Sequence, residues 1–449
     1  MMTKTSDLSV YIDARIPRIL LLGTISGFPA LLIGAVLTLW LREYDISRTV
    51  VGFIGFVSVV YTFNWLAAPF IDRTKVPVLT NLVGHRKSWI LLMQFLILFS
   101  IFTWSILSPE NNLFWIGLIA LLIAISSALQ DITIDALRIE QYKIDEGKGI
   151  AAGAATAVVG WMIGFKLGKM LLLSITSWLE NNGYENFWNL SFQIVCFFII
   201  ILNLLLLLIP EEKNSKKFDK QKQDQINLFG EESSVVEKIS KWFASTLANP
   251  LVSYFKKNGY QMGLLILSFL LLFKLGEAFL GKMSSVFYDD IGYSKFEIAI
   301  FSGLFGFITF TICTYLGSWF SIKSGIIRAL FISGILMAST NLLFTAIAWG
   351  GKSQIMFAVA ILFDDLAAAF ATVAFVTFIS LLVDRTYTAT QYALLSSIAT
   401  GGMKTFAAFS GVIVDWLQGD WGTFFIITAL MVIPSLILLW IIKKKIKFT

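Results

Sequence analysis

Apolar stretches long enough to cross a bilayer recur along the whole chain. A spanning helix needs about 20 mostly apolar residues, and twelve stretches come close to that length or exceed it. They are residues 19–41, 50–71, 88–107, 113–137, 150–178, 187–209, 262–286, 296–319, 326–349, 353–383, 391–414 and 421–442. The first is too long for the apolar core of a signal peptide and fits a spanning helix. The pattern predicts an all-α membrane protein with twelve transmembrane helices.

One long polar interval, residues 210–257, divides these stretches into six and six. Its first part, 211–225, is rich in Lys, Asp, Gln and Glu, which is typical of a flexible charged linker. Its second part, 235–255, is amphipathic and is expected to lie on the membrane surface. We therefore expect an N-terminal half (1–210), a cytoplasmic linker (211–257) and a C-terminal half (258–449).

The basic residues predict the orientation of the helices. If both termini are cytoplasmic, 26 Lys and Arg residues fall on the cytoplasmic side. The opposite side then keeps five, namely Arg42, Arg48, Lys282, Lys295 and Lys352. Such a bias follows the positive-inside rule, and an odd number of helices would destroy it. The bias also accounts for the net charge of +6, so no nucleic-acid partner is needed to explain it.

Composition agrees with a membrane protein and gives no sign of an enzyme. Hydrophobic residues make up 57% of the chain and charged residues only 14%, against about 25% charged in an average soluble domain. Cys196 and Cys313 lie inside apolar runs, and His85 is the only histidine. We expect no metal, no cofactor and no disulfide. No nucleophile–base or phosphate-loop pattern is present, and we expect a monomer embedded in lipid.

A charged loop follows the second apolar stretch. It reads Pro69-Phe-Ile-Asp72-Arg73 and then Gly84-His-Arg86-Lys87, which resembles the cytoplasmic loop motif of the major facilitator superfamily. A carboxylate at a helix end can pair with guanidinium groups and latch two helices together in one access state. The resemblance therefore implies a gating loop, whereas ordinary positive-inside charge is the simpler alternative. The gating residues would be Asp72, Arg73, Gly84, Arg86 and Lys87.

Ionisable side chains inside the apolar stretches are the strongest sign of a function. They are costly in a bilayer and usually face a cavity or a partner. An acid in the fourth stretch is followed by lysine in the fifth, and the same order recurs in the tenth and eleventh. This repetition predicts two carboxylate–ammonium sets that line one central cavity. The residues are Asp131, Asp135, Lys166, Lys169, Lys274, Glu277, Asp364, Asp365 and Lys404.

These residues suggest a proton-coupled carrier of an anionic substrate. The proton affinity of a carboxylate depends on its hydration and on nearby charges, and both change between access states. Asp131 is the first candidate for the proton site and Asp135 the second, although Asp135 could instead form a salt bridge at the helix end. Glu277 and Asp364 are further candidates. The lysines could hold the substrate or merely neutralise acids. The predicted substrate-binding residues are Gln94, Gln130, Lys166, Lys274, Asp365 and Lys404.

Glycines mark two places where helices bend or approach closely. Gly160, Gly164 and Gly168 form a ridge of small residues in the fifth stretch, which favours helix packing. Residues Gly23, Gly27 and Pro29 interrupt the first stretch. The first helices of repeats often line a substrate path, so we expect these breaks to face that path.

Several motifs together resemble one family of carriers, the AmpG muropeptide permeases. The run 126–136, Ser-Ser-Ala-Leu-Gln-Asp-Ile-Thr-Ile-Asp-Ala, resembles the signature of their fourth helix. Further matches lie at 26–29 (Ser-Gly-Phe-Pro), in the loop motif, at 274–279 (Lys-Leu-Gly-Glu-Ala-Phe) and at 388–396. The chain differs at Asp364-Asp365, where a Glu–Asn-like pair is expected, and in its additional Lys169.

The resemblance implies a major facilitator fold in the bacterial inner membrane. It also implies proton-driven import of N-acetylglucosaminyl-1,6-anhydro-N-acetylmuramyl peptides from periplasm to cytoplasm, with a link to cell-wall recycling and β-lactamase induction. Two alternatives stay open at this point. The same fold could carry another bulky anion, such as acetyl-CoA or a siderophore. It could also serve as an assembly factor or sensor that does not transport.

Overall fold

The computed structural model describes residues 9–46, 54, 57, 60–61, 63–143, 145–211, 235–293, 297, 301, 305–407 and 409–445. Every regular element among these residues is helical. Nine of the described helices are long and apolar enough to cross a membrane. The predicted stretches 50–71 and 296–319 fall partly outside the described residues, so the count of twelve and the sides of the termini stay predictions.

The first part of the chain forms long helices joined by short turns. The first predicted stretch is a nearly continuous helix whose middle, η2, is a π-helical turn. The elements are η1 (Ser9–Tyr11), α1 (Arg15–Leu31), η2 (Leu32–Val36), α2 (Leu37–Glu43), η4 (Asn64–Leu66), α4 (Ala68–Arg73), α5 (Leu79–Val83), α6 (His85–Trp104), α7 (Pro109–Glu140), α8 (Gly147–Met162), η5 (Ile163–Leu167), α9 (Gly168–Asn181) and α10 (Phe187–Leu207).

The second part begins with the helix that was predicted to be amphipathic, α12 (Val235–Asn258). The seventh predicted span is broken after α13, and Lys274 lies at the break. The remaining elements are α13 (Tyr260–Leu272), α14 (Leu275–Asp290), α16 (Gly306–Ser324), α17 (Ile326–Gly350), α18 (Gln354–Leu382), η7 (Arg385–Tyr387), α19 (Thr388–Ala407), α20 (Ser410–Trp416), α21 (Trp421–Leu430) and α22 (Ile433–Lys445).

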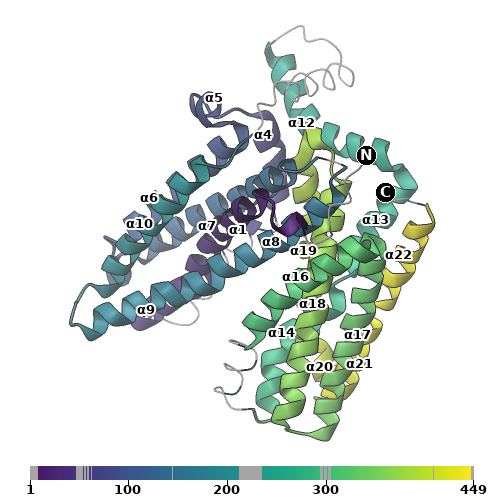
Figure 1. Cartoon of the computed structure of the whole chain (residues 1–449). Coiled ribbons are helices and arrows are strands. Elements are labelled where there is room, and N and C mark those ends of the chain that lie inside the picture. Colours follow the sequence, from purple (N-terminus) through teal and green to yellow (C-terminus); the bar gives the residue numbers. More distant parts are fainter. Residues whose placement is uncertain are drawn as a thin grey trace.

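The helices gather into two bundles that meet at one end and splay apart at the other (Figure 1). One bundle contains α1 and α6 to α10, and the other contains α13 to α22. We call the end where they meet, near α4, α12 and the start of α19, the latch end. Large apolar side chains such as Phe95, Phe102 and Leu208 remain exposed on the outside. Lipid is the solvent that such a surface requires.

Glycines let the first and fifth spans approach to backbone contact. A Cβ on Gly160 would lie 2.5 Å from the carbonyl oxygen of Leu20, and one on Gly164 would lie 2.3 Å from that of Thr24. Gly23 and Gly27 face the same contact from α1. The packing role predicted for the ridge is thus supported at Gly160 and Gly164. The prediction that Gly23 and Gly27 face a substrate path is wrong in this conformation, because both are buried against α8.

Replacing Gly27 with alanine is expected to destabilise this contact. The new Cβ would lie 2.1 Å from the carbonyl oxygen of Trp161, so the helices must separate, and overpacking of this kind costs about 1–3 kcal/mol. Gly281→Ala in α14 is the matched control, because nothing lies within 4 Å of its Cβ position. Thermal unfolding in detergent should show a lower melting temperature for Gly27→Ala alone. Equal melting of the two variants would contradict the prediction.

Candidate functional site

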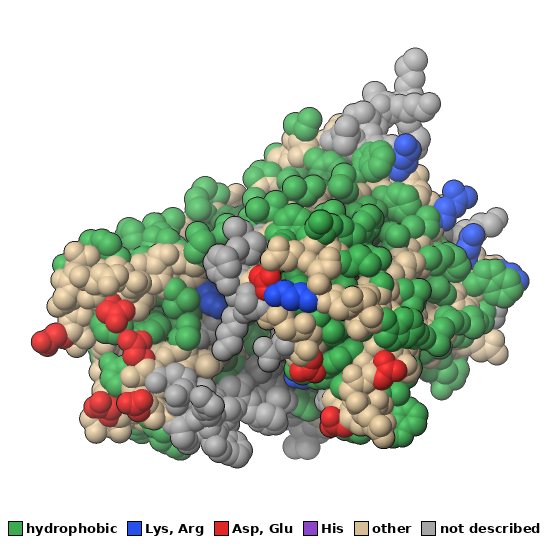
Figure 2. Space-filling model, turned by 90° about the horizontal axis from the view of Figure 1, so that it is seen from below, with side chains coloured by type: hydrophobic (Ala, Val, Ile, Leu, Met, Phe, Trp, Pro, Cys, Tyr) green, Lys and Arg blue, Asp and Glu red, His purple; other side chains and the backbone are tan. Residues whose placement is uncertain are grey.

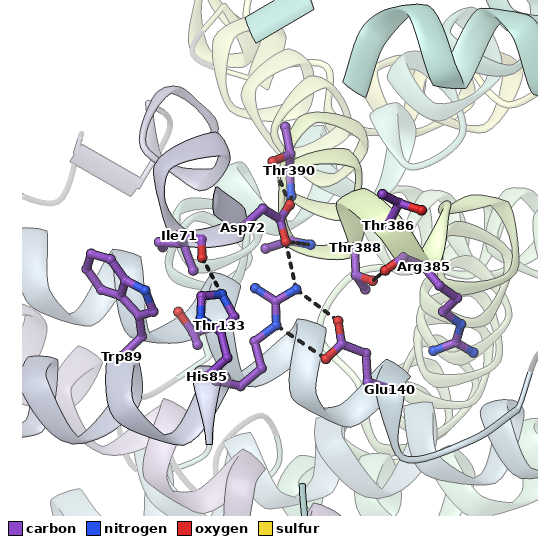
Figure 3. A network of polar contacts seen from close by, with 12 residues as sticks. Ile71, Asp72, His85, Trp89, Thr133, Glu140, Arg385, Thr386, Thr388 and Thr390 are labelled. Carbon is purple, nitrogen blue, oxygen red and sulfur yellow. Dashed lines mark hydrogen bonds and ion pairs between the residues drawn. The ribbon is translucent and has the colours of Figure 1, made fainter. Parts of the chain in front are cut away.

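A buried ion-pair network occupies the latch end (Figure 3). Arg86, the first-turn arginine of α6, places Nη2 2.7 Å from Oδ1 of Asp72 and 2.8 Å from Oε1 of Glu140. The side chains of Arg86 and Asp72 are 1% and 0% exposed. Two acids around one guanidinium satisfy the charges that burial would otherwise leave costly. The network ties α4, α6 and the end of α7 together.

Asp72 also joins the two bundles. Its Oδ2 accepts hydrogen bonds from the backbone N–H and the side-chain hydroxyl of Thr390, both at 2.7 Å. Thr390 lies in the first turn of α19, in the other bundle. A carboxylate at the N-terminus of a helix satisfies free N–H groups and interacts favourably with the helix dipole. The predicted gating carboxylate is therefore positioned to hold the latch end closed.

The residues between Arg73 and Gly84 include the short helix α5, which carries the chain from Asp72 to Arg86. Gly84 follows it with φ +107°, a conformation that favours glycine. A Cβ there would lie 2.5 Å from Oε2 of Glu211. The Glu211 carboxylate accepts hydrogen bonds from the N–H groups of Arg86, at 2.6 Å, and Lys87, at 3.0 Å. Glu211 therefore caps α6 from the segment that follows α10.

Glu211 should make the stability of this loop depend on pH. Burial raises the pKa of its carboxyl group, although the two N–H donors and the charge of Arg86 oppose this. A raised pKa favours the protonated form in the fold, so its contribution is present at low pH and is lost as the pH rises through the raised pKa. We expect the melting temperature of wild type, relative to Glu211→Gln, to fall as the pH rises from about 4. A difference that is constant with pH would refute this.

Further polar contacts close the same end. Ser397 donates to Oδ1 of Asn64 at 2.8 Å, and Arg138 donates to the hydroxyl of Ser380 at 3.3 Å. Arg385 donates to the backbone carbonyl oxygen of Ile139. Each contact joins an element that precedes residue 210 to one that follows it. The latch is therefore part of a wider closed surface and not an isolated ion pair.

The two predicted acids of α7 have different surroundings. Asp131 is half-buried in the middle of the helix and accepts a hydrogen bond from the hydroxyl of Ser26 on α1, at 2.7 Å. Asp135 instead forms a salt bridge with Arg138, at 3.1 Å. This geometry favours the salt-bridge alternative for Asp135. Of these two acids, Asp131 is the one for which the contacts in the described part of the chain include no basic side chain.

Gln94 and Gln130 lie within the packed bundle. They are 3% and 0% exposed. Gln94 donates to the side-chain oxygen of Gln130, whose own amide donates to the backbone carbonyl oxygen of Ile25 at 3.0 Å. In this conformation the pair holds α1, α6 and α7 together. Their assignment as substrate-binding residues stays a prediction, and the geometry gives it no support.

A second group of ionisable side chains forms around the break between α13 and α14. Lys274 lies 3.0 Å from Oε1 of Glu277 and donates to the hydroxyl of Thr372 on α18, at 2.8 Å. Asp364 accepts a hydrogen bond from Thr340 at 3.3 Å and interacts electrostatically with Glu277 and Lys274. Helix breaks are common where carriers bind their substrates. Three predicted residues are thus brought together, each with a polar partner.

Lys166 and Asp365 interact across the seam between the bundles. Lys166 lies in the π-helical turn η5, and its charge interacts with that of Asp365 on α18. The hydroxyl of Thr309 donates to Oδ2 of Asp365. The acid that acts electrostatically on Lys166 thus belongs to the other bundle, while the two carboxylate–ammonium sets around one central cavity stay a prediction. The side chain of Lys404 lies outside the described residues.

Viewed from below, some charged side chains lie near the middle of the molecule and others at its outer ends, and apolar surface covers much of the rest (Figure 2). Asp131 and Lys166 come from one bundle, while Lys274, Glu277, Asp364 and Asp365 come from the other. A set of acids and lysines within apolar spans can bind anions and exchange protons. This chemistry suits a carrier.

Comparison with known proteins identifies the family. The family model for the Major Facilitator Superfamily matches residues 19–338. The chain belongs to the Major Facilitator Superfamily. Within it, AmpG 4 of Rickettsia conorii, which is named as a transporter, is 30% identical over 440 residues, covering 97% of this chain and 98% of the relative. The resemblance to AmpG proteins is confirmed.

Two further similarities extend this result. The anhydromuropeptide permease of Escherichia coli K12 is 26% identical over 443 residues, covering 98% of this chain and 82% of the permease. The solved structure of the proton:xylose symporter XylE, bound to 6-bromo-6-deoxy-D-glucose, matches with a TM-score of 0.64 at 15% identity, covering 96% of each chain. The latter supports the fold alone.

Membership of this superfamily confirms several predictions. The chain has the major facilitator fold and is a membrane transporter rather than an enzyme. It is a multi-pass protein of the bacterial inner membrane that handles a small molecule.

Sequence reasoning missed the partners of the gating residues. Glu140 carries no local signal, and Thr390 lies in the matching run 388–396 without any sign of its partner, because each becomes important only when Asp72 and Arg86 are brought beside it. Glu211 could have been suspected from its place at the end of an apolar span. Ser26 lay inside a motif already identified, yet its bond to Asp131 depends on how α1 and α7 pack.

Proposed function

We propose that this transporter imports anhydromuropeptides from the periplasm to the cytoplasm and is driven by protons. The observation that carries the proposal is the similarity to an anhydromuropeptide permease along 98% of the chain. The ionisable side chains along the seam support it, since a disaccharide peptide carries carboxylates that lysines can bind. Lys166 and Lys274 are the described candidates for that role.

Asp131 is the proposed proton site. It is the acid of α7 that bonds a hydroxyl rather than a cation, so a proton can be gained or lost there without breaking an ion pair. Movement of α1 against α7 would change both the Ser26 bond and the hydration of the carboxyl group. Either change alters the proton affinity of Asp131. Proton-coupled transport requires such a difference in proton affinity between the conformations open to the two sides of the membrane. Glu277 and Asp364 are proposed to share this role in the other bundle.

The latch fits alternating access. With the loop of Asp72 and Arg86 on the cytoplasmic side, as the positive-inside bias predicts, this conformation is closed toward the cytoplasm. Its splayed end (Figure 1) then faces the periplasm. Opening to the cytoplasm must break the Asp72–Thr390 contacts, so the proposed cycle exchanges them for contacts at the opposite end.

Uptake into proteoliposomes tests the proposal. Radiolabelled N-acetylglucosaminyl-anhydro-N-acetylmuramyl tripeptide should accumulate when an inward proton gradient is imposed, and a protonophore should abolish the accumulation. Unlabelled muropeptide should compete, whereas acetyl-CoA and a ferric siderophore should not. Absence of gradient-dependent uptake, or competition by acetyl-CoA alone, would overturn the proposed substrate or its coupling.

A further inference from the structure

Lys166 lies where the fifth span departs from regular α-helix. Residues Ile163–Leu167 form the π-helical turn η5 between α8 and α9. Single π-turns within α-helices are rare and occur frequently at functional sites. Lys169, one turn further along, lies in the regular α9. The irregular turn therefore sets the direction of Lys166 separately from that of the other lysine on this span.

The groups that face Lys166 belong to the other bundle. Its Nζ lies 5.5 Å from the centre of the Phe307 ring on α16, and its charge interacts with that of Asp365 on α18. Asp131, the acid in its own bundle, contacts Ser26 instead. Lys166 thus lies beside α16 of the other bundle and is attracted by the Asp365 carboxylate, without a direct ion pair between the two in this conformation.

Groups on α16 hold the Asp365 carboxylate in place. The hydroxyl of Thr309 donates to Oδ2, and the same oxygen lies 3.3 Å from the Cβ position of Gly306, where a side chain would crowd it. Asp364, its neighbour in sequence, bonds Thr340 on α17. The two adjacent acids therefore face different helices, and Asp365 is the one that lies against α16, the helix beside which Lys166 also lies.

A half-buried ammonium group within a membrane span is costly unless a negative group lies near it, and this holds in every conformation of the two bundles. An acidic substrate in the seam supplies carboxylates that can replace Asp365 beside Lys166. This replacement would weaken the electrostatic attraction between Lys166 and Asp365, and so between the bundles, when the substrate binds. A ligand shifts a conformational equilibrium only by binding one state better than the other, and this exchange of partners provides such a difference.

We propose that Lys166 binds an anionic group of the transported molecule in competition with Asp365, so that substrate binding weakens the electrostatic attraction between the bundles at this point. The inference rests on the proposed function only in requiring an acidic substrate. It assigns opposite effects to the two residues: Lys166 attracts the substrate, whereas Asp365 competes with it.

Distance measurements test the attraction without any substrate. Spin labels would be placed at two exposed positions, Asn181, the last residue of α9 in one bundle, and Asp415 of α20 in the other, in a background with Cys196→Ser and Cys313→Ser. We expect Lys166→Met and Asp365→Asn to shift the distance distribution to longer, broader values, and the exchange Lys166→Asp with Asp365→Lys to restore it. Lys169→Met is the matched control and should leave it unchanged.

Binding measurements test the competition. A thermal-shift titration would use N-acetylglucosaminyl-anhydro-N-acetylmuramyl tripeptide and the same compound with its carboxylates methylated. Wild type should bind the acidic form more tightly, and Lys166→Met should lose that preference. Asp365→Asn should bind the acidic form at least about fivefold more tightly, the lower end of usual coupling between sites.

The outcomes separate this inference from the proposed substrate. Weaker binding by Asp365→Asn, or equal binding of both forms by wild type, would overturn the competition. Distance distributions unchanged in both single variants would overturn the attraction. If wild type binds acetyl-CoA and no muropeptide, the proposed substrate fails, and the same variants titrated with acetyl-CoA decide the role of Lys166.

Discussion

Replacing Asp72 with alanine is expected to open the latch end and to destabilise the protein by about 3–5 kcal/mol, the usual result of removing one partner from a buried ion pair. Arg86 would keep Glu140 but lose the acid that lies 2.7 Å from its Nη2. The first turn of α19 would also lose the acceptor for the N–H and hydroxyl of Thr390. Loss of a helix cap adds about 1 kcal/mol.

A matched control exists within the same chain. Asp420 caps α21 by accepting hydrogen bonds from Thr423, but it lies on the surface. Asp420→Ala therefore removes a carboxylate cap without uncovering a buried cation. Thermal unfolding in detergent should show a much larger decrease for Asp72→Ala than for Asp420→Ala, with Asp72→Asn between them because its amide oxygen still accepts. Equal decreases for the two alanine variants would contradict a buried latch.

The spans of the helices could be predicted because lipid imposes a simple requirement on the chain. Each helix must satisfy its own backbone and present about 20 apolar residues to the bilayer. The predicted stretch 326–349 therefore matches α17 (Ile326–Gly350), and 187–209 matches α10 (Phe187–Leu207). Short irregularities, such as the π-helical turn η5 and the break at Lys274, hardly change the hydropathy averaged over a span. The hydropathy pattern therefore could not predict them.

The pairing of polar side chains could not be predicted in the same way. Which acid meets which lysine depends on how each helix is rotated, and rotation is fixed by packing such as the contact of Gly27 with Trp161. The loop motif led to Asp72 and Arg86, but not to Glu140 or Thr390, whose roles arise from contacts over long sequence separations. For Lys166, the order of acids and lysines along the chain grouped it with the acids of the fourth stretch, whereas the acid that acts on its charge in the fold is Asp365 of the other bundle.

Replacing Asp131 with asparagine is expected to abolish accumulation driven by a proton gradient, down to the level of empty liposomes. Asparagine keeps an oxygen that can accept the hydrogen bond from Ser26, so the packing of α1 on α7 should survive. It cannot gain or lose a proton, however, and the transport cycle would lose its coupling. Exchange of labelled for unlabelled muropeptide, which needs no net proton movement, should continue in the variant.

Asp135→Asn provides the contrast on the same helix. Asp135 pairs with Arg138 at 3.1 Å, and the Arg138 side chain is only 2% exposed, so its replacement leaves a buried cation without its acid. We expect a lower melting temperature but gradient-driven accumulation that persists in the folded fraction. Uptake and exchange measured side by side in both variants would decide between the two acids. Accumulation that survives in Asp131→Asn but is lost in Asp135→Asn would move the proton site to Asp135, because coupling must fail wherever the titrating carboxyl group is removed.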